Sequence, residues 1–385
     1  MSAGLYVHVP FCAKKCLYCN FYSVIGTAPQ IQDYATALQQ EIDLFSNRAV
    51  WKTQQFSTIY FGGGTPSLLP PHQISSILVK LTNSFSFASS PEITLEANPE
   101  STSRQHLKLY RGMGFNRINI GIQSFFPHSL ELLGRIHNVQ QATSSIRHAR
   151  LSGFDNIGID LIFGIPGQTF TEWETCLETA LAFEPEHIST YSLTLEKGTA
   201  LTHLIESGTY RNVDEESERR QYLHAIDFLS AHGYEHYEIS NFARTGFRSV
   251  HNQLYWNRAP YLGLGPSAHS FYPNIRYSNF SDLVTWHTQV RKGRRPVEMM
   301  ERLSPDQQML EWIFLGLRKR EGFRVSDFND RFKVNFEQKY RAVLKKLNDR
   351  HRRDDAEPFL VFDNGWLKLS RRGLLLYDSI CAEFA

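Results

Sequence analysis

The sequence lacks long apolar runs and any strong excess of one charge. Its 385 residues hold 41 Lys and Arg against 39 Asp and Glu, so the formal net charge is only +2. That near balance gives no electrostatic reason to expect a nucleic-acid partner. No apolar stretch approaches the roughly 20 residues that a membrane-spanning helix needs. The first residues, MSAGLYVHV, lack the charged start and apolar core of a signal peptide, so we expect a cytoplasmic protein.

Cysteine is also scarce, and its distribution argues against two common uses. There are only five cysteines, and Cys176 and Cys381 stand alone. An odd number in a long chain without a secretion signal does not suggest a disulfide framework. Structural zinc usually takes four ligands, often as two separated pairs, and the sequence has no second pair.

The remaining cysteines, Cys12, Cys16 and Cys19, are spaced C-x3-C-x2-C. Three thiolates on one short loop can hold three irons of a [4Fe–4S] cluster, whereas familiar ferredoxin spacings supply four ligands. The fourth iron is then open to a small molecule, to which it can pass an electron. We therefore predict a site-open cluster, with zinc or plain buried thiols as the alternatives.

Short apolar runs alternate with amphipathic segments over the first half of the chain, which is typical of βαβ units with a parallel sheet. The fold class is therefore α/β, and six strands favour a partial (β/α)6 TIM-like barrel over a closed eightfold one. A doubly wound open sheet is the competing fold. The runs are at 5–9, 58–61, 92–96, 117–122, 156–163 and 187–195, with amphipathic segments near 30–48, 71–85, 102–112, 127–152 and 170–183.

The pattern changes further along, and we expect three parts. Residues 1–235 would form the barrel core, and residues 236–302 a connecting region packed on it, with loops over 241–275. Residues 303–385 predict a small, mostly helical, winged-helix-like domain that ends in a hairpin with an Asn364-Gly365 turn, followed by a last helix.

Candidate site residues fall where the predicted strands end, and ligands sit at the carboxyl ends of the strands in such folds. The cysteine loop follows the first strand and the run Gly62-Gly63-Gly64-Thr65-Pro66 follows the second. Three glycines let the backbone approach a ligand closely. No Gly-Lys-Ser/Thr follows, so this is not a phosphate loop. Asp160 interrupts an apolar strand and needs a polar partner, which a ligand could supply.

Together these features resemble the radical S-adenosylmethionine (SAM) superfamily. The segments YVHVPFC, FGGGTPS, LEANPE, INIGIQSF and GIDLIFGIPGQT are similar to its oxygen-independent coproporphyrinogen III oxidase group, over nearly the whole chain. The resemblance implies that the open iron binds SAM. Carried over to this sequence, it implies SAM contacts at Tyr6, Tyr18, Gly63, Gly64, Thr65, Glu96, Gln123, Arg135 and Asp160.

Two departures set the chain apart from the oxidase proper. The oxidases have a fourth cysteine where this chain has Phe21, and they carry a long segment before the cluster loop, where only eleven residues precede Cys12. Both departures point to a shorter sister group of haem chaperones, whose H-N-x-x-Y-W signature is matched by residues 251–256. This resemblance implies haem as a ligand, with His251 as a candidate iron ligand and His269 as a further one. The alternative is that the motif only packs a loop over the barrel.

We therefore expect a haem chaperone that binds haem and SAM and passes haem to apo-haemoproteins, with transient membrane-protein contact and homodimerisation among its interactions. The alternative is an enzyme that cleaves SAM and acts on a porphyrinogen. A nucleic-acid-modifying enzyme would need a dedicated binding module, and the sequence shows only two basic runs, at 291–295 and 350–353, which we expect to be solvated. We expect no stable nucleic-acid complex.

Overall fold

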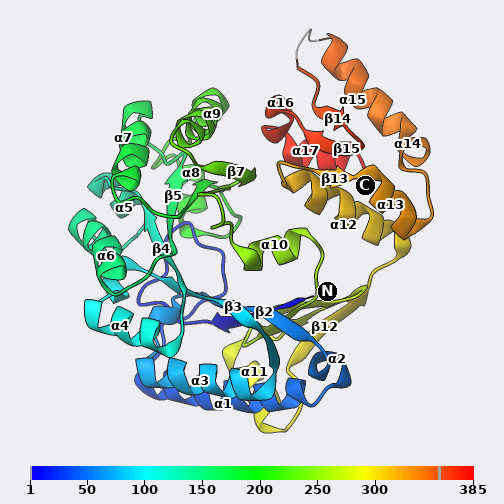
Figure 1. The fold of residues 1–385 in the computed structure, drawn as a ribbon. Coiled ribbons are helices and arrows are strands. Elements are labelled where there is room, and N and C mark those ends of the chain that lie inside the picture. The colour runs from blue at the N-terminus through cyan, green and yellow to red at the C-terminus, as the bar shows by residue number, and fades with distance from the viewer. Residues whose placement is uncertain (1, 354–356) are drawn as a thin grey trace.

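The structure is a computed structural model that describes residues 2–353 and 357–385. Six neighbouring strands run parallel in the order β1 to β6, which confirms the predicted strands, and helices surround them (Figure 1). The strands are β1 (Ala3–Val9), β2 (Gln55–Gly63), β3 (Ser86–Ala97), β4 (Arg117–Gln123), β5 (Ile157–Phe163) and β6 (His187–Ser192). The helices are α1 (Ala28–Ser46), α2 (Ala49–Lys52), α3 (Pro71–Ser84), α4 (Arg104–Met113), α5 (Pro127–Leu132), α6 (Val139–Leu151), α7 (Phe170–Leu181), α8 (Ala200–Glu206) and α9 (Glu215–Ala231).

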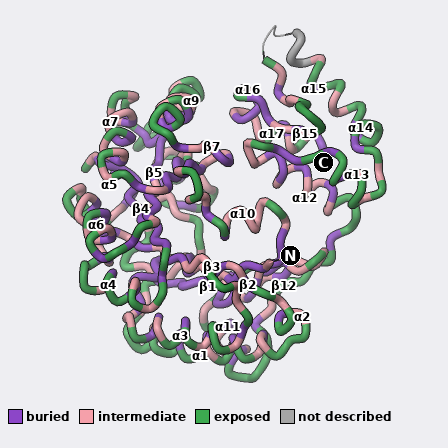
Figure 2. The backbone as a smooth tube through the Cα atoms, viewed as in Figure 1, coloured by how far each residue is buried: buried purple, intermediate pink, exposed green. Residues whose placement is uncertain are grey.

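Strand β4 shows how the sequence positions the site. Its side chains alternate between the two faces of the sheet, as in any strand. Ile118, Ile120 and Ile122 belong to the hydrophobic core, whereas Asn119 and Gln123 line a cavity on the other face. Every residue of β4 is buried. Buried residues follow the inner strands and exposed residues the outer faces of the helices (Figure 2). The polar side chains of β4 therefore point into the barrel interior, whereas its apolar side chains pack in the core.

The sheet continues beyond the six parallel strands on both edges, to twelve strands in all in the described residues. Strand β8 pairs antiparallel with β6, and β9 pairs parallel with β1. We expected loops over 241–275, and this was wrong, because the segment forms strands. These strands are short, with three to five residues each. The added elements are β7 (Glu235–Glu238), β8 (Asn241–Ala243), α10 (Val250–Trp256), β9 (Tyr261–Leu264), β10 (His269–Tyr272), β11 (Ile275–Asn279), α11 (Leu283–Arg291) and β12 (Val297–Arg302). The boundaries at 235 and 303 stay a prediction.

The carboxyl-terminal part combines helices with a three-stranded sheet of order β13-β15-β14. The expected hairpin is present, and Asn364 (φ 50°) and Gly365 (φ 81°) have the positive φ that a type I′ turn requires. The elements are α12 (Pro305–Arg318), β13 (Phe323–Arg324), α13 (Val325–Phe332), α14 (Phe336–Lys339), α15 (Arg341–Arg353), β14 (Leu360–Asp363), β15 (Trp366–Leu369), α16 (Arg371–Leu374) and α17 (Tyr377–Ala382). The side chains of the basic run at 350–353 lie outside the described residues. Among the helices described, none has the length and apolar character needed to cross a membrane.

A buried carboxyl group ties α1 to the sheet extension. The side chain of Glu41 accepts hydrogen bonds from the Gly265 amide (2.8 Å), Asn279 Nδ2 (2.6 Å) and Trp286 Nε1 (3.2 Å). Burial raises the pKa of Glu41 from its ordinary value of 4.5 to about 8, although the three donors act in the opposite direction. The folded state therefore binds the Glu41 proton more tightly than the unfolded chain does. The contribution of Glu41 to the free energy of unfolding consequently falls as the pH rises from 4.5 toward 8.

Glu41→Ala is expected to destabilise the protein by about 3 kcal/mol at pH 7, because three buried donors lose their acceptor. The midpoint of thermal unfolding, followed by circular dichroism, measures the effect. Gln40→Ala on the exposed face of the same helix is the matched control and should leave the midpoint unchanged. Equal unfolding midpoints for the Glu41 and Gln40 variants would show that the hydrogen bonds of Glu41 do not stabilise the fold.

Candidate functional site

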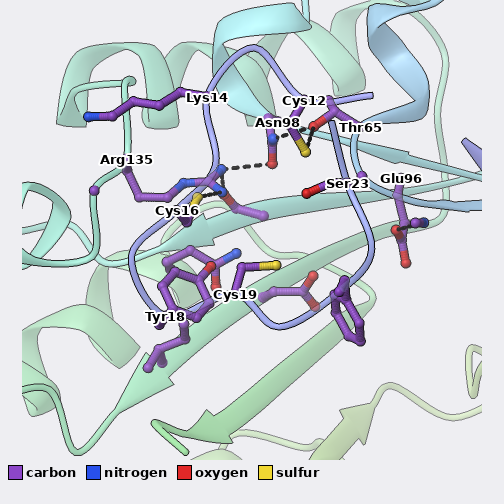
Figure 3. A pocket seen from close by; sticks show the side chains of 18 of the residues that line it. Cys12, Lys14, Cys16, Tyr18, Cys19, Ser23, Thr65, Glu96, Asn98 and Arg135 are labelled. Carbon is purple, nitrogen blue, oxygen red and sulfur yellow. Dashed lines mark hydrogen bonds between the residues drawn. The ribbon is translucent and has the colours of Figure 1, made fainter. Parts of the chain in front are cut away.

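The three closely spaced cysteines lie on the loop between β1 and α1 and line one cavity of about 420 Å³ (Figure 3). Backbone hydrogen bonds hold this loop at several points. The Cys12 amide donates to the Val24 carbonyl and the Leu17 amide to the Leu133 carbonyl, each at 3.0 Å. These two bonds fix the start of the loop to its last residues and the middle of the loop to the turn after α5. The three sulfurs face the same cavity.

Polar groups from the turn after β2 and from the loop after α5 reach two of the sulfurs. The hydroxyl of Thr65 donates to Cys12 Sγ at 3.6 Å, and Arg135 Nη1 donates to Cys16 Sγ at 3.4 Å. Burial, together with the nearby Cys16 and Cys12, raises the pKa of Cys19. Thiols in this setting need a positive partner to become thiolates, and metal coordination supplies it. The donor set therefore fits an iron–sulfur cluster.

In the described part of the chain, no three His, Cys, Asp or Glu side chains converge closely enough to share one metal ion. A cluster does not require such convergence, because each cysteine ligates a different iron. Three sulfurs spread around one cavity are consistent with that arrangement.

The glycine turn after β2 brings its backbone against the cysteine loop. The Gly64 amide donates to the Val9 carbonyl at 2.8 Å, and the Thr65 amide donates to the Phe11 carbonyl at 2.7 Å. A Cβ atom on Gly64 would lie 2.6 Å from the Phe11 oxygen and 3.0 Å from Cys12 Sγ. Gly63 has a φ of 115°, which side-chain-bearing residues rarely adopt. The glycines therefore let two loops close on each other beside the cysteines.

A hydrogen-bonded chain links the cysteine loop to β3 and β4. Arg135 Nη2 donates to Asn98 Oδ1 at 2.7 Å and to the Gly121 carbonyl at 3.0 Å. Asn98 Nδ2 in turn donates to Thr65 Oγ1 at 2.9 Å. The single residue Asn98 thus connects the donors to Cys12 and Cys16, and Figure 3 shows it between them. It lies in the LEANPE segment, two residues after Glu96, and sequence reasoning overlooked it.

Two buried carboxyl groups face the same cavity from β3 and β5. Glu96 accepts from the Tyr60 hydroxyl at 2.6 Å and the Gly63 amide at 3.3 Å. Burial, reinforced by Asp160, raises the pKa of Glu96 to about 7. Asp160 Oδ2 accepts from Asn119 Nδ2 at 2.6 Å, whereas its buried Oδ1 has no partner among the described residues. Burial also raises the pKa of Asp160. An unpaired buried oxygen of this kind is suited to a ligand that donates hydrogen bonds.

The structure brings most of the sequence-predicted contacts together. Those that line the cysteine cavity, besides the cysteines themselves, are Tyr18, Gly63, Gly64, Thr65, Glu96, Gln123, Arg135 and Asp160. Tyr6 lies outside that group and lines a second, adjoining cavity. Asn98, Asn119 and Tyr191 also line the first cavity and were not predicted.

His251 lies in α10, where it is only 1% exposed. Its Nδ1 is 2.7 Å from Thr58 Oγ1 and its Nε2 is 2.7 Å from the Tyr255 hydroxyl. Burial lowers the pKa of His251 to about 3. Ligation of haem iron by His251 stays a prediction, and this arrangement leaves neither ring nitrogen free. The ring instead orients Tyr255.

Comparison with family models identifies two matching segments. Residues 6–180 match the model described as the radical SAM superfamily, and residues 303–376 match the HemN C-terminal domain. The second match covers the elements that follow β12 as far as α16, and it ends before α17.

Comparison with curated proteins and solved structures extends over nearly the whole chain. A protein of Lactococcus lactis subsp. lactis (strain IL1403) named heme chaperone HemW is 34% identical over 94% of this chain and 93% of its own length. The heme chaperone HemW of Bacillus subtilis (strain 168) is 33% identical over 98% of each chain. The solved coproporphyrinogen III oxidase HemN of Escherichia coli, described as a radical SAM enzyme, superposes with a TM-score of 0.85 at 25% identity, over 100% of this chain and 90% of that one.

Proposed function

This chain belongs to the HemW family within the radical SAM superfamily, and from that premise we propose that it binds haem and delivers it to apo-haemoproteins. The observation that carries the proposal is the end-to-end similarity to curated haem chaperones. It is supported by Phe21, which stands where the oxidase resemblance leads us to expect a fourth cysteine. Phe21 lines the cysteine cavity and is 65% exposed, and its phenyl ring has no atom that could ligate iron.

The family implies a [4Fe–4S] cluster and SAM, and the residues of this chain fit both. Cys12, Cys16 and Cys19 would hold the cluster, and Arg135 would neutralise part of its thiolate charge. When bound and reduced, the cluster supplies one electron to a ligand on its open iron. The carboxyl groups of Glu96 and Asp160 would accept hydrogen bonds from the SAM ammonium and ribose hydroxyls. The buried walls would exclude water from that ligand.

Asp160→Asn is expected to weaken SAM binding by about tenfold to a hundredfold, the usual effect of losing a charged hydrogen-bond acceptor. The cluster should remain, because the side-chain donors to Cys12 and Cys16 are Thr65 and Arg135 and not Asp160. Equilibrium binding of SAM to the reconstituted protein measures the change. Asp155→Asn, at an exposed position just before β5, is the control. An unchanged affinity in the Asp160 variant would remove this carboxylate from the SAM site.

The proposed function is tested by titrating anaerobically reconstituted protein with haem, after the cluster has been verified. Stoichiometric binding, followed by transfer of haem to an apo-haemoprotein such as apomyoglobin, supports the proposal. Absence of haem binding by protein with an intact cluster contradicts it.

A second function, oxidation of a porphyrinogen, is favoured by the likeness to the coproporphyrinogen III oxidase structure. The test is incubation of the same preparation with SAM, a reductant and coproporphyrinogen III. Formation of protoporphyrinogen with turnover would establish the enzyme, and the argument from Phe21 would then be wrong.

A further inference from the structure

A second cavity of about 590 Å³ adjoins the cysteine cavity, and the two share Asn20, Phe21, Gly63 and Glu96 as common wall. Its other walls come from α10, from the sheet extension β9–β11 and from α12 of the carboxyl-terminal part. The volume is within the range of small-molecule sites, which extends from about 300 to 1,000 Å³. No residue predicted from the sequence as a SAM contact lies there, apart from Tyr6 and the shared Gly63 and Glu96.

Flat aromatic side chains form much of this second cavity. The ring centroids of Tyr255 and Tyr261 are 4.6 Å apart, and those of Tyr261 and Phe271 are 6.1 Å apart. Trp256 and Phe314 line the same space. Such walls suit a large, flat, mostly apolar ligand.

The cavity also carries hydrogen-bond donors that lack an acceptor. Arg258 and Arg276 both pair with Glu311, at 3.0 and 2.6 Å, so two positive charges meet one negative charge. Among the described residues, Arg258 Nη1, Arg276 Nε and Trp256 Nε1 are buried without a hydrogen-bond partner. The cluster of Arg258, Arg276 and Glu311 carries a net positive charge and unused donors, so it is suited to a ligand that bears carboxylates.

Two histidines line the second cavity, and they differ in availability. His8 Nδ1 is 3.1 Å from the Tyr6 hydroxyl, and its Nε2 is 3.1 Å from the Tyr22 carbonyl, so both nitrogens are engaged. The imidazole of His269 is exposed and makes no hydrogen bond or ion pair with the described residues. An imidazole nitrogen is a common ligand of haem iron, and the accessible ring of His269 is therefore suited to that role.

We propose that this second cavity is the haem site, with His269 as iron ligand, the aromatic walls against the macrocycle, and Arg276 with Trp256 as donors to the propionates. The inference deepens the proposed function and rests on it. It assigns His251 a positioning role, because the His251 ring holds the Tyr255 hydroxyl behind the cavity wall.

The test compares two probes, haem and iron-free protoporphyrin IX, on the reconstituted full-length protein. His269→Ala is expected to weaken haem binding by about tenfold and to abolish the resonance Raman signature of imidazole ligation. It should leave protoporphyrin affinity unchanged, because that probe has no iron. Arg276→Gln should weaken both probes by a similar factor. His203→Ala, an exposed histidine on α8, is the control and should match the parent protein.

The outcomes separate this inference from the proposed function. If the parent protein binds no haem, the proposed function itself fails. If it binds haem, and the His269 and Arg276 variants keep the parent affinity and Raman spectrum, the second cavity is not the haem site although the chaperone function stands. Loss of imidazole ligation in His251→Ala, with His269→Ala unaffected, likewise overturns the assignment.

Discussion

Single replacement of Cys12, Cys16 or Cys19 by alanine is expected to abolish the cluster. A [4Fe–4S] cluster on three protein ligands has no spare thiolate, and neither Cys176 nor Cys381 lines the cavity. The reconstituted parent protein should contain about four iron and four sulfide per chain, with charge-transfer absorbance in the visible range. Each of the three variants should retain almost none of either.

Cys381→Ala is the matched control for this series, since it removes a partly buried thiol near the carboxyl end without touching the cavity. It should keep the full iron content. A variant at position 12, 16 or 19 with the iron, sulfide and spectrum of the parent would mean that the cysteine concerned is not a ligand. If metal analysis of protein purified without oxygen finds zinc in place of iron, the result would support the alternative that the three cysteines bind zinc.

Gly64→Ala is expected to have the second-largest effect on the cluster. The added methyl group would lie 2.6 Å from the Phe11 carbonyl oxygen, which is backbone and cannot turn aside. Either the turn or the cysteine loop must shift, and Cys12 Sγ lies only 3.0 Å from the same methyl position. Overpacking of this kind destabilises a protein by about 2 kcal/mol. Iron content after reconstitution should fall several-fold.

The control is Gly112→Ala in α4. No atom lies within 4 Å of a Cβ at that position, so the new methyl group meets open space. Alanine is the better helix former by about 1 kcal/mol, so this variant should be at least as stable as the parent and should assemble its cluster normally. Equal iron contents in the Gly64 and Gly112 variants would contradict the proposed close contact between the turn and the cysteine loop.

The parallel core was predictable because its strands are buried on both faces. Runs such as 117–122 and 156–163 are short and largely apolar, and the intervening segments have helical periodicity. The strands after residue 235 gave no comparable signal. β8 has three residues and β9 has four, and nearby Gly, Pro and Asn residues are equally typical of loops. Pairing with the edges of the core sheet forms these strands, and that pairing is a long-range effect.

The first cavity was predictable for a related reason, because the ends of successive parallel strands meet at one edge of the sheet. Asn98 was missed because its role depends on a simultaneous view of Thr65 and Arg135. The second cavity joins Tyr6 to Tyr255 and Glu311, which lie 249 and 305 residues further along the chain, and a local sequence pattern carries no such information. The seven-residue helix α10 was too short for periodicity to indicate that His251 points inward.

If SAM occupies the first cavity and haem the second, as we propose, the shared wall would let each ligand affect the binding of the other. Phe21 and Glu96 line both cavities, so a ligand that moves either side chain in one cavity changes the free energy of ligand binding in the other. Linkage is reciprocal, and if haem alters the SAM dissociation constant by some factor, SAM alters that of haem by the same factor. SAM that is never consumed would then still act as an effector, because its binding would change the affinity of the protein for haem. The loading and release of a porphyrin would then follow the supply of a nucleoside.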